Sequence, residues 1–202
     1  MKEIYIIRHG QTEHNKKGIV QGKGVNLPLN ETGQAQAQKF FEAYGHIPFD
    51  VVFTSTLLRA QETVANFINQ GIKHEIRSAL DEISWGDMEG KHTILDTSDE
   101  FVNLISEWKN GNLSFAPQNG ESPLVLQARQ KPFIEEIIQS DFEKILVCMH
   151  GRAMRSLLCT MTETPLSKME EFPHANLSLY KLNLKNGLFE IELFNHREHT
   201  KI

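Results

Sequence analysis

Residues that could carry out phosphoryl transfer lie at or shortly after the ends of four apolar segments. They are two histidines, three arginines and one glutamate: Arg8, His9, Arg59, Glu82, His150 and Arg152. A neutral imidazole is a competent nucleophile near neutral pH, and its phosphoramidate can pass the group onward. Arginine matches phosphate oxygens with its planar fork, and a carboxylic acid can protonate the departing oxygen. These residue types predict phosphoryl transfer in which guanidinium groups, rather than a metal ion, neutralise the charge.

The four apolar segments predict the strands that would bring these side chains together. The expected strands span residues 2–7, 49–54, 75–80 and 144–149. Ligands of open α/β sheets bind beyond the carboxyl ends of the strands, so residues far apart in the chain would meet at one edge. The residue types leave two points open. Either His9 or His150 could be the nucleophile, and Asp81 or Glu89 could replace Glu82 as the acid.

Helical patterns alternate with these strands. We expect helices over residues 31–44, 56–68, 100–109, 122–139 and 152–162. The dipeptide Asn186-Gly187 predicts a hairpin between two further strands, over residues 177–184 and 188–194. This alternation predicts an α/β protein, a three-layer α/β/α sandwich with a mostly parallel central sheet. Residues 1–202 are expected to form a single domain, with a small cap insertion around residues 87–120.

The composition limits the expected partners and location. The net charge is −5, whereas a nucleic-acid-binding surface needs a basic face. No apolar stretch approaches the roughly 20 residues of a membrane span, and the N-terminal segment lacks the pattern of a signal peptide. Cys148 and Cys159 are too few for a disulfide framework or a thiolate metal cluster. We therefore expect a cytoplasmic protein without nucleic-acid or membrane partners.

Ordered motifs surround the candidate residues and cover nearly the whole chain. They are Arg8-His9-Gly10-Gln11-Thr12 with Asn15, Gln21-Gly22, Asn26-Leu27-Pro28-Leu29 with Gly33 and Gln36-Ala37, Ser55–Thr63, Leu80-Asp81-Glu82 with Gly86 and Glu89-Gly90, Gly120-Glu121-Ser122, and His150-Gly151. A lone Arg-His-Gly would be weak evidence, but an ordered set is specific. The set resembles the histidine phosphatase superfamily, also called the phosphoglycerate mutase-like family.

The resemblance implies a role for each matching residue. The catalytic residues would be His9 as the phosphorylated nucleophile, Glu82 as the proton donor, and Arg8, Arg59 and His150 around the phosphate. The substrate-binding residues would be Asn15 near the phosphate, Gln21 and Gly22 at the entrance, and Gly151. The resemblance implies neither a metal ion nor a cofactor.

Three functions are compatible with the resemblance. We favour a phosphatase that hydrolyses a small phosphomonoester through a covalent phosphohistidine on His9. The alternative is a cofactor-dependent phosphoglycerate mutase. Such mutases are expected to be longer, with insertions that shield the intermediate from water, whereas the segment between Glu82 and Gly120 is short here. A non-catalytic module for phosphorylated ligands is least favoured. The partner would be a small phosphorylated metabolite, and a homodimer stays an open option.

Some residues near the motifs have less defined expectations. Arg152 follows Gly151 where the family usually has a second glycine, so it adds a cation near the site. Asn176 stands where the family often has a supporting asparagine, but a structural loop role is equally expected, and it is not among the predicted site residues. Trp85 and Met88 are expected to pack in the cap or the pocket wall.

Overall fold

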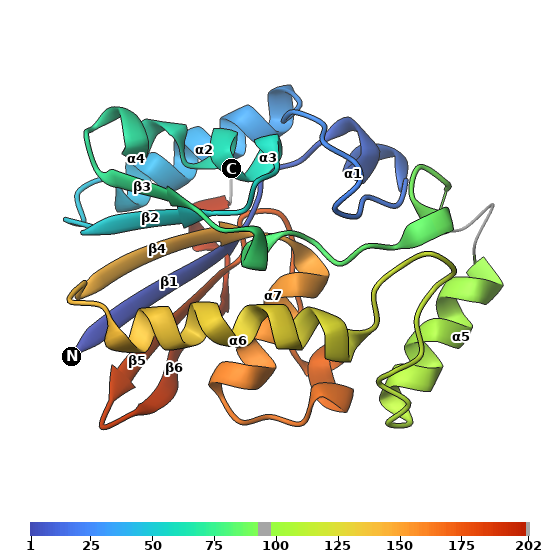
Figure 1. Cartoon of the computed structure of the whole chain (residues 1–202). Coiled ribbons are helices and arrows are strands. Elements are labelled where there is room, and N and C mark those ends of the chain that lie inside the picture. Colours follow the sequence, from blue (N-terminus) through green and yellow to red (C-terminus); the bar gives the residue numbers. More distant parts are fainter. Residues whose placement is uncertain (93–97, 201–202) are drawn as a thin grey trace.

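The computed structural model describes residues 1–92 and 98–200, and its strands form one sheet in the order β3-β2-β4-β1-β5-β6 (Figure 1). The strands are β1 Lys2–Arg8, β2 Val51–Thr54, β3 Lys73–Ile76, β4 Lys144–Met149, β5 Leu179–Lys185 and β6 Leu188–His196. Strands β1 to β4 are parallel, whereas β5 pairs antiparallel with both β1 and β6. The prediction of a mostly parallel central sheet is confirmed.

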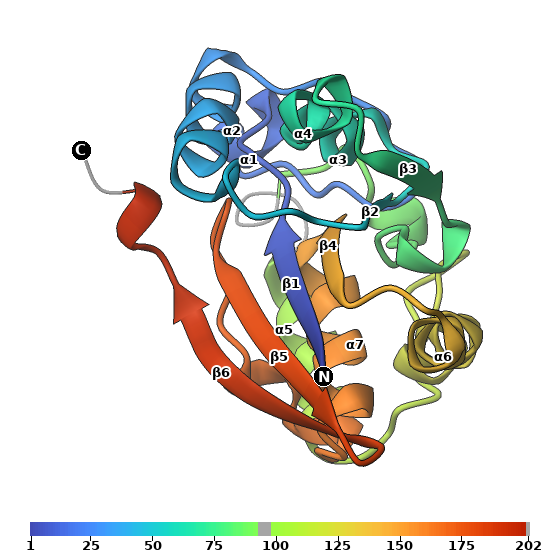
Figure 2. The same ribbon diagram turned by 90° about the vertical axis from the view of Figure 1, so that its left-hand side faces the viewer.

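Helices cover both faces of this sheet. They are α1 Glu13–Lys17, α2 Glu31–Tyr44, α3 Leu58–Thr63, α4 Ala65–Asn69, α5 Ser98–Lys109, α6 Pro123–Gln139 and α7 Gly151–Met161. Helices α2, α3 and α4 lie on one face and α6 and α7 on the other (Figure 2). Helix α5 lies toward the end of the molecule at which the parallel strands finish (Figure 1). The predicted three-layer sandwich is therefore confirmed.

The central strands are buried on both faces, as expected for parallel strands between two helical layers. Ile4 and Ile6 of β1 belong to the core on the α6–α7 side, whereas Tyr5 and Ile7 belong to the core under α2–α4. A shift of one residue would exchange these two sets, so burial fixes the register of β1. In that register Arg8 lies opposite Met149, the last residue of β4. The residues that follow the two strands therefore start side by side.

The predicted helix over residues 56–68 is two helices in the structure, α3 and α4, separated at Val64. Thr63 accounts for the break. Its Oγ1 donates to the carbonyl oxygen of Arg59 at 2.6 Å and accepts from the N–H of Gly10 at 2.9 Å. Such back-bonding bends helices. The same contacts tie α3 to the loop that follows β1, behind the cavity described below.

The predicted third strand, residues 75–80, is shifted in the structure. Strand β3 ends at Ile76, and a 3₁₀ turn occupies Ser78–Leu80. Strand β2 has only four residues, and its last residue, Thr54, pairs with Ile76. The N–H of Arg77 makes the final hydrogen bond between the two strands, to the carbonyl oxygen of Thr54 at 2.8 Å. The turn buries Leu80 and carries the chain to Glu82.

Helix α1 was not expected from the sequence. Its five residues begin after the N-cap Thr12, and the Asn15 side chain completes a capping box with the Thr12 backbone. The segment expected to be a cap, residues 87–120, contains α5, and its residues 93–97 lie outside the described residues. Of the helices described, none combines the length and apolar character needed to cross a bilayer.

Candidate active site

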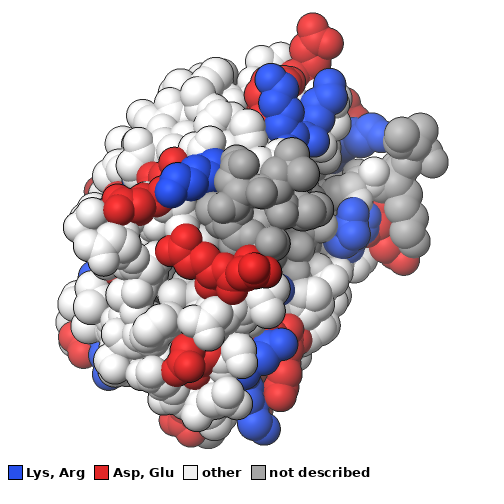
Figure 3. Space-filling view, turned by 90° about the vertical axis from the view of Figure 1, so that its right-hand side faces the viewer, with Lys and Arg blue, Asp and Glu red and all other residues white. Residues whose placement is uncertain are grey.

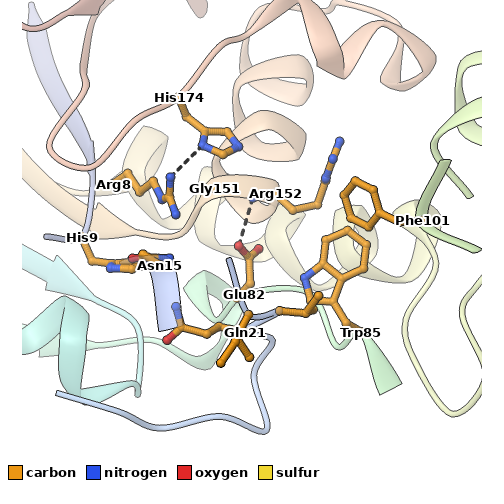
Figure 4. Close-up of a pocket in the computed structure, with 12 residues that line it drawn as sticks. Arg8, His9, Asn15, Gln21, Glu82, Trp85, Phe101, Gly151, Arg152 and His174 are labelled. Carbon is orange, nitrogen blue, oxygen red and sulfur yellow. Dashed lines mark hydrogen bonds between the residues drawn. The ribbon is translucent and has the colours of Figure 1, made fainter. Parts of the chain in front are cut away.

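A cavity of about 260 Å³ lies beyond the carboxyl ends of β1 and β4 (Figure 4). Most of the predicted site residues are on its wall, namely Arg8, His9, Asn15, Gln21, Glu82 and Gly151. The other predicted residues, Arg59, His150 and Gly22, are not on the wall. Arg59 and His150 are fully buried, and they contact the wall from behind.

His9 presents an unprotonated ring nitrogen at the cavity wall. Its Nδ1 lies 2.7 Å from the carbonyl oxygen of Gly10. A carbonyl can only accept, so Nδ1 carries the proton and Nε2 carries the lone pair. Nε2 has no hydrogen-bond partner among the residues that the structure describes. Burial, followed by the charges of Arg59 and Arg8, holds the pKa of His9 well below its ordinary value of 6.5, which keeps the ring neutral.

His150 is held differently, although its ring centroid is only 5.1 Å from that of His9. Its Nδ1 accepts from Nε of Arg59 at 3.2 Å, so Nε2 must carry the proton of the neutral ring. Nε2 lies 2.7 Å from Oγ of Ser55 and donates to it. Burial holds the pKa of His150 well below 6.5 as well. Both of its nitrogens are therefore engaged with the protein.

Arg8 lies on the cavity wall and has one buried N–H group without a partner among the described residues. Its Nη1 lies 3.2 Å from Nδ1 of His174 (Figure 4). Burial, and then the charge of Arg8, lowers the pKa of His174 to about 2, so the imidazole is neutral and accepts this hydrogen bond. Nε of Arg8 is buried without a hydrogen-bond partner in the described part of the chain. An anion in the cavity would supply the missing acceptor.

Arg59 supplies positive charge from behind the wall. Besides His150, it donates through Nη1 to the carbonyl oxygen of Val25 and through Nη2 to that of Gly22 at 3.3 Å. Burial lowers its pKa to about 10, which still leaves it charged near neutral pH. Its largest effect on the site is electrostatic, because its charge opposes protonation of both histidines.

The carboxylate of Glu82 is positioned by backbone N–H groups. Oε1 accepts from Ile83 at 3.0 Å and from Ala153 at 2.7 Å, and Oε2 accepts from Arg152 at 3.0 Å (Figure 4). Two of these donors belong to the first turn of α7, where the helix dipole also favours an acidic group. Oε1 has both lone pairs in use, whereas Oε2 keeps one for a proton.

The alternative acids are used elsewhere. The carboxylate of Asp81 accepts from the backbone N–H and the hydroxyl of Thr56 at 2.8 and 2.9 Å. Glu89 accepts from the N–H of Trp85 at 3.0 Å. Neither residue is on the cavity wall, whereas Glu82 is. The geometry therefore favours Glu82 among the three carboxylates.

Asn15 is oriented by its own amide oxygen. Oδ1 accepts from the N–H of Thr12 and from Nδ2 of Asn176, both at 3.2 Å, which leaves the NH₂ group without a partner in the described residues. Asn176 also donates to the carbonyl oxygen of His9 at 2.9 Å, so the residue omitted from the prediction supports two wall residues. Gln21 is bound through its amide to the hydroxyl of Thr12 at 2.8 and 3.0 Å.

Two of the predicted residues are glycines because other side chains occupy the space of a Cβ. At Gly151 a Cβ would lie 2.6 Å from the ring of His174, which is the residue that holds Arg8. At Gly22 it would lie 1.9 Å from Oε1 of Glu89. Gly151 therefore lets α7 start close to the cavity, and Gly22 lets Glu89 pack against its loop.

Several wall residues were not predicted as part of the site. They are Ile19, Val20, Trp85, Phe101, Arg152 and His174. Trp85 was expected at the pocket wall or in the cap, and Arg152 as a nearby cation. Phe101 and His174 had no usable signal, because one lies on an amphipathic helix and the other in a loop. Their positions depend on how these segments pack.

Charge on the nearby surface is mixed. Figure 3 shows the face at the right-hand side of Figure 1, where basic and acidic side chains lie in small neighbouring groups. The described side chains form no extended basic surface on this face. Positive charge is instead concentrated inside, in the buried Arg59 and in Arg8 and Arg152 on the cavity wall. This arrangement suits a small anionic ligand.

Comparison with known proteins identifies the family. A family model described as the histidine phosphatase superfamily (branch 1) matches residues 4–197. This chain belongs to that superfamily. The fold and the order of the motifs agree with this membership, since the match covers the whole described cavity and all of the strands except the first two residues of β1.

Relatives of this superfamily member carry different names. The adenosylcobalamin/alpha-ribazole phosphatase of Salmonella typhimurium is 26% identical over 96% of this chain and 96% of its own length. The 2,3-bisphosphoglycerate-dependent phosphoglycerate mutase of Parvibaculum lavamentivorans is 29% identical over 96% of this chain and 97% of its own length. The solved structure of Bacillus stearothermophilus YhfR is 25% identical, with a TM-score of 0.87 and 100% coverage of both chains.

The mutase relative corrects one step of the sequence argument. We expected mutases of the superfamily to be longer than this chain. The Parvibaculum mutase aligns over 96% of this chain and 97% of its own length, so that expectation fails for this relative. Overall length therefore does not distinguish a phosphatase from a mutase here. The distinction depends on whether water reaches the phosphorylated intermediate.

Proposed function

We propose that this member of the histidine phosphatase superfamily is a metal-independent phosphatase that hydrolyses small phosphomonoesters through a phosphohistidine on His9. The observation that carries the proposal is the contrast between the two rings. Nε2 of His9 is unprotonated and unpaired at the cavity wall, whereas both nitrogens of His150 are engaged. The phosphatase name of the Salmonella relative also supports the proposal.

In the first step, Nε2 of His9 attacks phosphorus and the bond from phosphorus to the leaving oxygen breaks. Arg8 and the NH₂ group of Asn15 are the unpaired donors that face the phosphoryl oxygens, with the charge of Arg59 behind them. Oε2 of Glu82 carries the proton and gives it to the leaving oxygen. The products are an alcohol and a phosphorylated His9.

In the second step, water attacks the phosphorus of the phosphohistidine. The ionised Glu82 takes a proton from this water, and the nitrogen–phosphorus bond breaks. Inorganic phosphate leaves, His9 returns to its neutral form, and Glu82 is protonated again. The backbone donors at Ile83, Arg152 and Ala153 hold the carboxylate in place in both steps.

A phosphoglycerate mutase is the second candidate, because the Parvibaculum relative has that name and matches along nearly the whole chain. The first step would be the same. The two functions differ in whether water or a second hydroxyl of the substrate accepts the phosphoryl group from His9.

A phosphorus NMR time course on 3-phosphoglycerate tests the proposal, with EDTA present and a trace of 2,3-bisphosphoglycerate as primer. We expect inorganic phosphate to accumulate at a rate that EDTA does not change. Growth of 2-phosphoglycerate instead would assign the mutase function. If neither 3-phosphoglycerate nor p-nitrophenyl phosphate is turned over, the proposal is wrong and the non-catalytic module for phosphorylated ligands is the remaining function.

Three coarser expectations accompany this proposal. Residues 1–202 would form one domain in which residues 87–120 act as a cap, and the position of Phe101 of α5 on the cavity wall supports that role. The protein would act in the cytoplasm on a small phosphorylated metabolite. A homodimer stays open, and sedimentation velocity would decide it.

A further inference from the structure

Arg152 is a wall residue whose side chain the proposed reaction does not use. Its side chain extends from the start of α7 toward Phe101 and Trp85, away from His9 (Figure 4). The residue is only 6% exposed, and its Nε has no hydrogen-bond partner among the described residues. A buried donor without an acceptor is unfavourable. The cavity therefore has a second place, apart from Arg8, where an anion would be stabilised.

The charges around Arg152 do not balance. Nη1 of Arg152 and Nη1 of Arg155 both pair with the carboxylate of Glu170. When Glu82 carries its proton, as at the start of the proposed reaction, two guanidinium groups against one carboxylate leave a net charge of +1 in this partly buried cluster. Arg155 is not on the cavity wall and donates through Nε to the carbonyl oxygen of Phe172 at 2.9 Å. Within this cluster, Arg152 is the cation that the cavity can reach.

Two tryptophans hold the guanidinium group of Arg152. Its Cζ lies 5.8 Å from the ring centre of Trp85 and 5.3 Å from that of Trp108. The two rings are themselves stacked, with centres 5.8 Å apart and planes at 29°. Together with the pair to Glu170, these contacts fix the side chain before a ligand arrives. A ligand that binds it loses little further side-chain freedom.

We propose that Arg152 binds a carboxylate on the leaving group, so that the preferred substrates are small phosphomonoesters of hydroxy acids. This inference rests on the proposed function, which places the phosphoryl group at His9 and the leaving oxygen at Glu82. Oε2 of Glu82 accepts from the backbone N–H of Arg152, so the leaving oxygen and Arg152 are neighbours. A leaving group protonated by Glu82 therefore starts beside this residue.

The charge and the size of the cavity favour a carboxylate over a second phosphate. A carboxylate carries one negative charge, which matches the net +1 of the cluster. A phosphate dianion would exceed it and would lie near Glu170. The cavity volume of about 260 Å³ suits a leaving group with few carbon atoms.

Competitive inhibition of p-nitrophenyl phosphate hydrolysis tests this assignment. The two inhibitors are 3-phosphoglycerate and glycerol 3-phosphate, which differ only by a carboxylate in place of a hydroxymethyl group. A ligand that occupies the cavity competes whether or not it is turned over. The readout is the inhibition constant of glycerol 3-phosphate divided by that of 3-phosphoglycerate. A charge-assisted contact predicts a ratio of about 10 to 100 for the unaltered protein.

Arg152→Met keeps the length and much of the packing of the side chain, and it is expected to bring the ratio to within about threefold of one. Arg152→Gln serves the same purpose if the methionine variant fails to fold. The matched control is Arg155→Met, which removes a cation from the same cluster but not from the wall. It is expected to keep at least half of the ratio, since only direct contact separates the two inhibitors strongly.

The possible results separate this inference from the proposed function. Hydrolysis of p-nitrophenyl phosphate with a ratio near one would overturn the role of Arg152 and leave the phosphatase intact. An equal fall of the ratio in the Arg155 and Arg152 variants would also overturn the role of Arg152, because the preference would then come from the positive charge of the cluster and not from direct contact. Absence of any hydrolysis would remove the proposed function, and this inference with it.

Discussion

The His9 end of the cavity and the Arg152 end are positioned by different parts of the molecule. At the His9 end, functional residues follow β1 and β4, whose pairing places Arg8 opposite Met149. At the other end, the wall comes from Trp85 in a turn and Phe101 on α5, which are outside the sheet. Backbone pairing therefore fixes the position of the reacting groups. Packing of aromatic side chains shapes the end of the cavity that we propose for the leaving group.

The hydrogen bonds of the two ends follow the same division. Glu82 is held by three backbone N–H groups, so its position depends on the fold rather than on neighbouring side chains. Arg152 is held by the Glu170 carboxylate and two tryptophan rings, all of them side chains. Substitution can change the second arrangement without disturbing the first. This difference explains how one fold can carry one chemistry and several substrate preferences.

The largest expected effect separates the two histidines of the His9 end. His9→Ala removes the proposed nucleophile and should lower kcat/KM by at least about 10⁴-fold. It should also abolish acid-labile labelling by a ³²P-labelled substrate. His150→Ala removes a ring whose two nitrogens are both engaged with Arg59 and Ser55, so it should slow turnover by about 10²-fold and still allow labelling.

Rapid quench into alkaline detergent after a single turnover makes this test direct, because the acid-labile phosphohistidine survives in base. Labelling that persists in His9→Ala would move the phosphorylated residue elsewhere. Labelling lost only in His150→Ala would exchange the roles of the two rings. Circular dichroism of both variants controls for misfolding, because both rings are buried.

Most of the fold could be predicted from local patterns. Residues 31–44 show helical spacing between Asn30 and Gly45, and the structure has a helix over the same residues. The break between α3 and α4 could not be predicted, because it depends on Thr63 contacting Gly10, far away in the chain. The end of β3 could not be predicted either, since it is set by the length of β2.

The site shows the same limit of local information. His9, Glu82 and His150 follow apolar segments, and that position marked them as candidates, although it did not choose Glu82 over Asp81 or Glu89. Only the family resemblance favoured His9 over His150. The residue types could not separate them, because the difference is in their hydrogen bonds to Gly10, Arg59 and Ser55. Phe101 could not be predicted as a site residue either, because no local sequence pattern shows that α5 packs beside the cavity.

An intermediate effect is expected for the acid. Glu82→Gln keeps the volume but has no acidic proton, and its NH₂ group would face a backbone donor. Hydrolysis of glycerol 3-phosphate, whose alkoxide needs a proton, should fall by about 10²- to 10⁴-fold. Hydrolysis of p-nitrophenyl phosphate should fall far less, because nitrophenolate leaves without protonation.

Glu89→Gln is the matched control for the acid, since Glu89 is a nearby carboxylate that is not on the cavity wall. It should change the rates of both substrates by a similar factor. Equal losses of both substrates in Glu82→Gln would assign the acid role to another group. A leaving-group dependence that appeared only in Glu89→Gln would assign it to Glu89.

The smallest expected effect belongs to the other end of the cavity. Phe101→Ala removes an aromatic wall residue whose ring centre lies 5.3 Å from that of Trp85. An aromatic contact of Phe101 with the nitrophenyl ring would contribute about 1 kcal/mol, so KM for p-nitrophenyl phosphate should rise by about fivefold. The change should fall mainly on KM, because the ring lies at the end of the cavity proposed for the leaving group and not at the end proposed for the phosphoryl group. Val102→Ala is the matched control, since Val102 follows on the same helix, is 66% exposed and is absent from this wall. A larger loss in kcat than in KM would mean that α5 positions the reacting groups, and the two ends of the cavity would then not be independent.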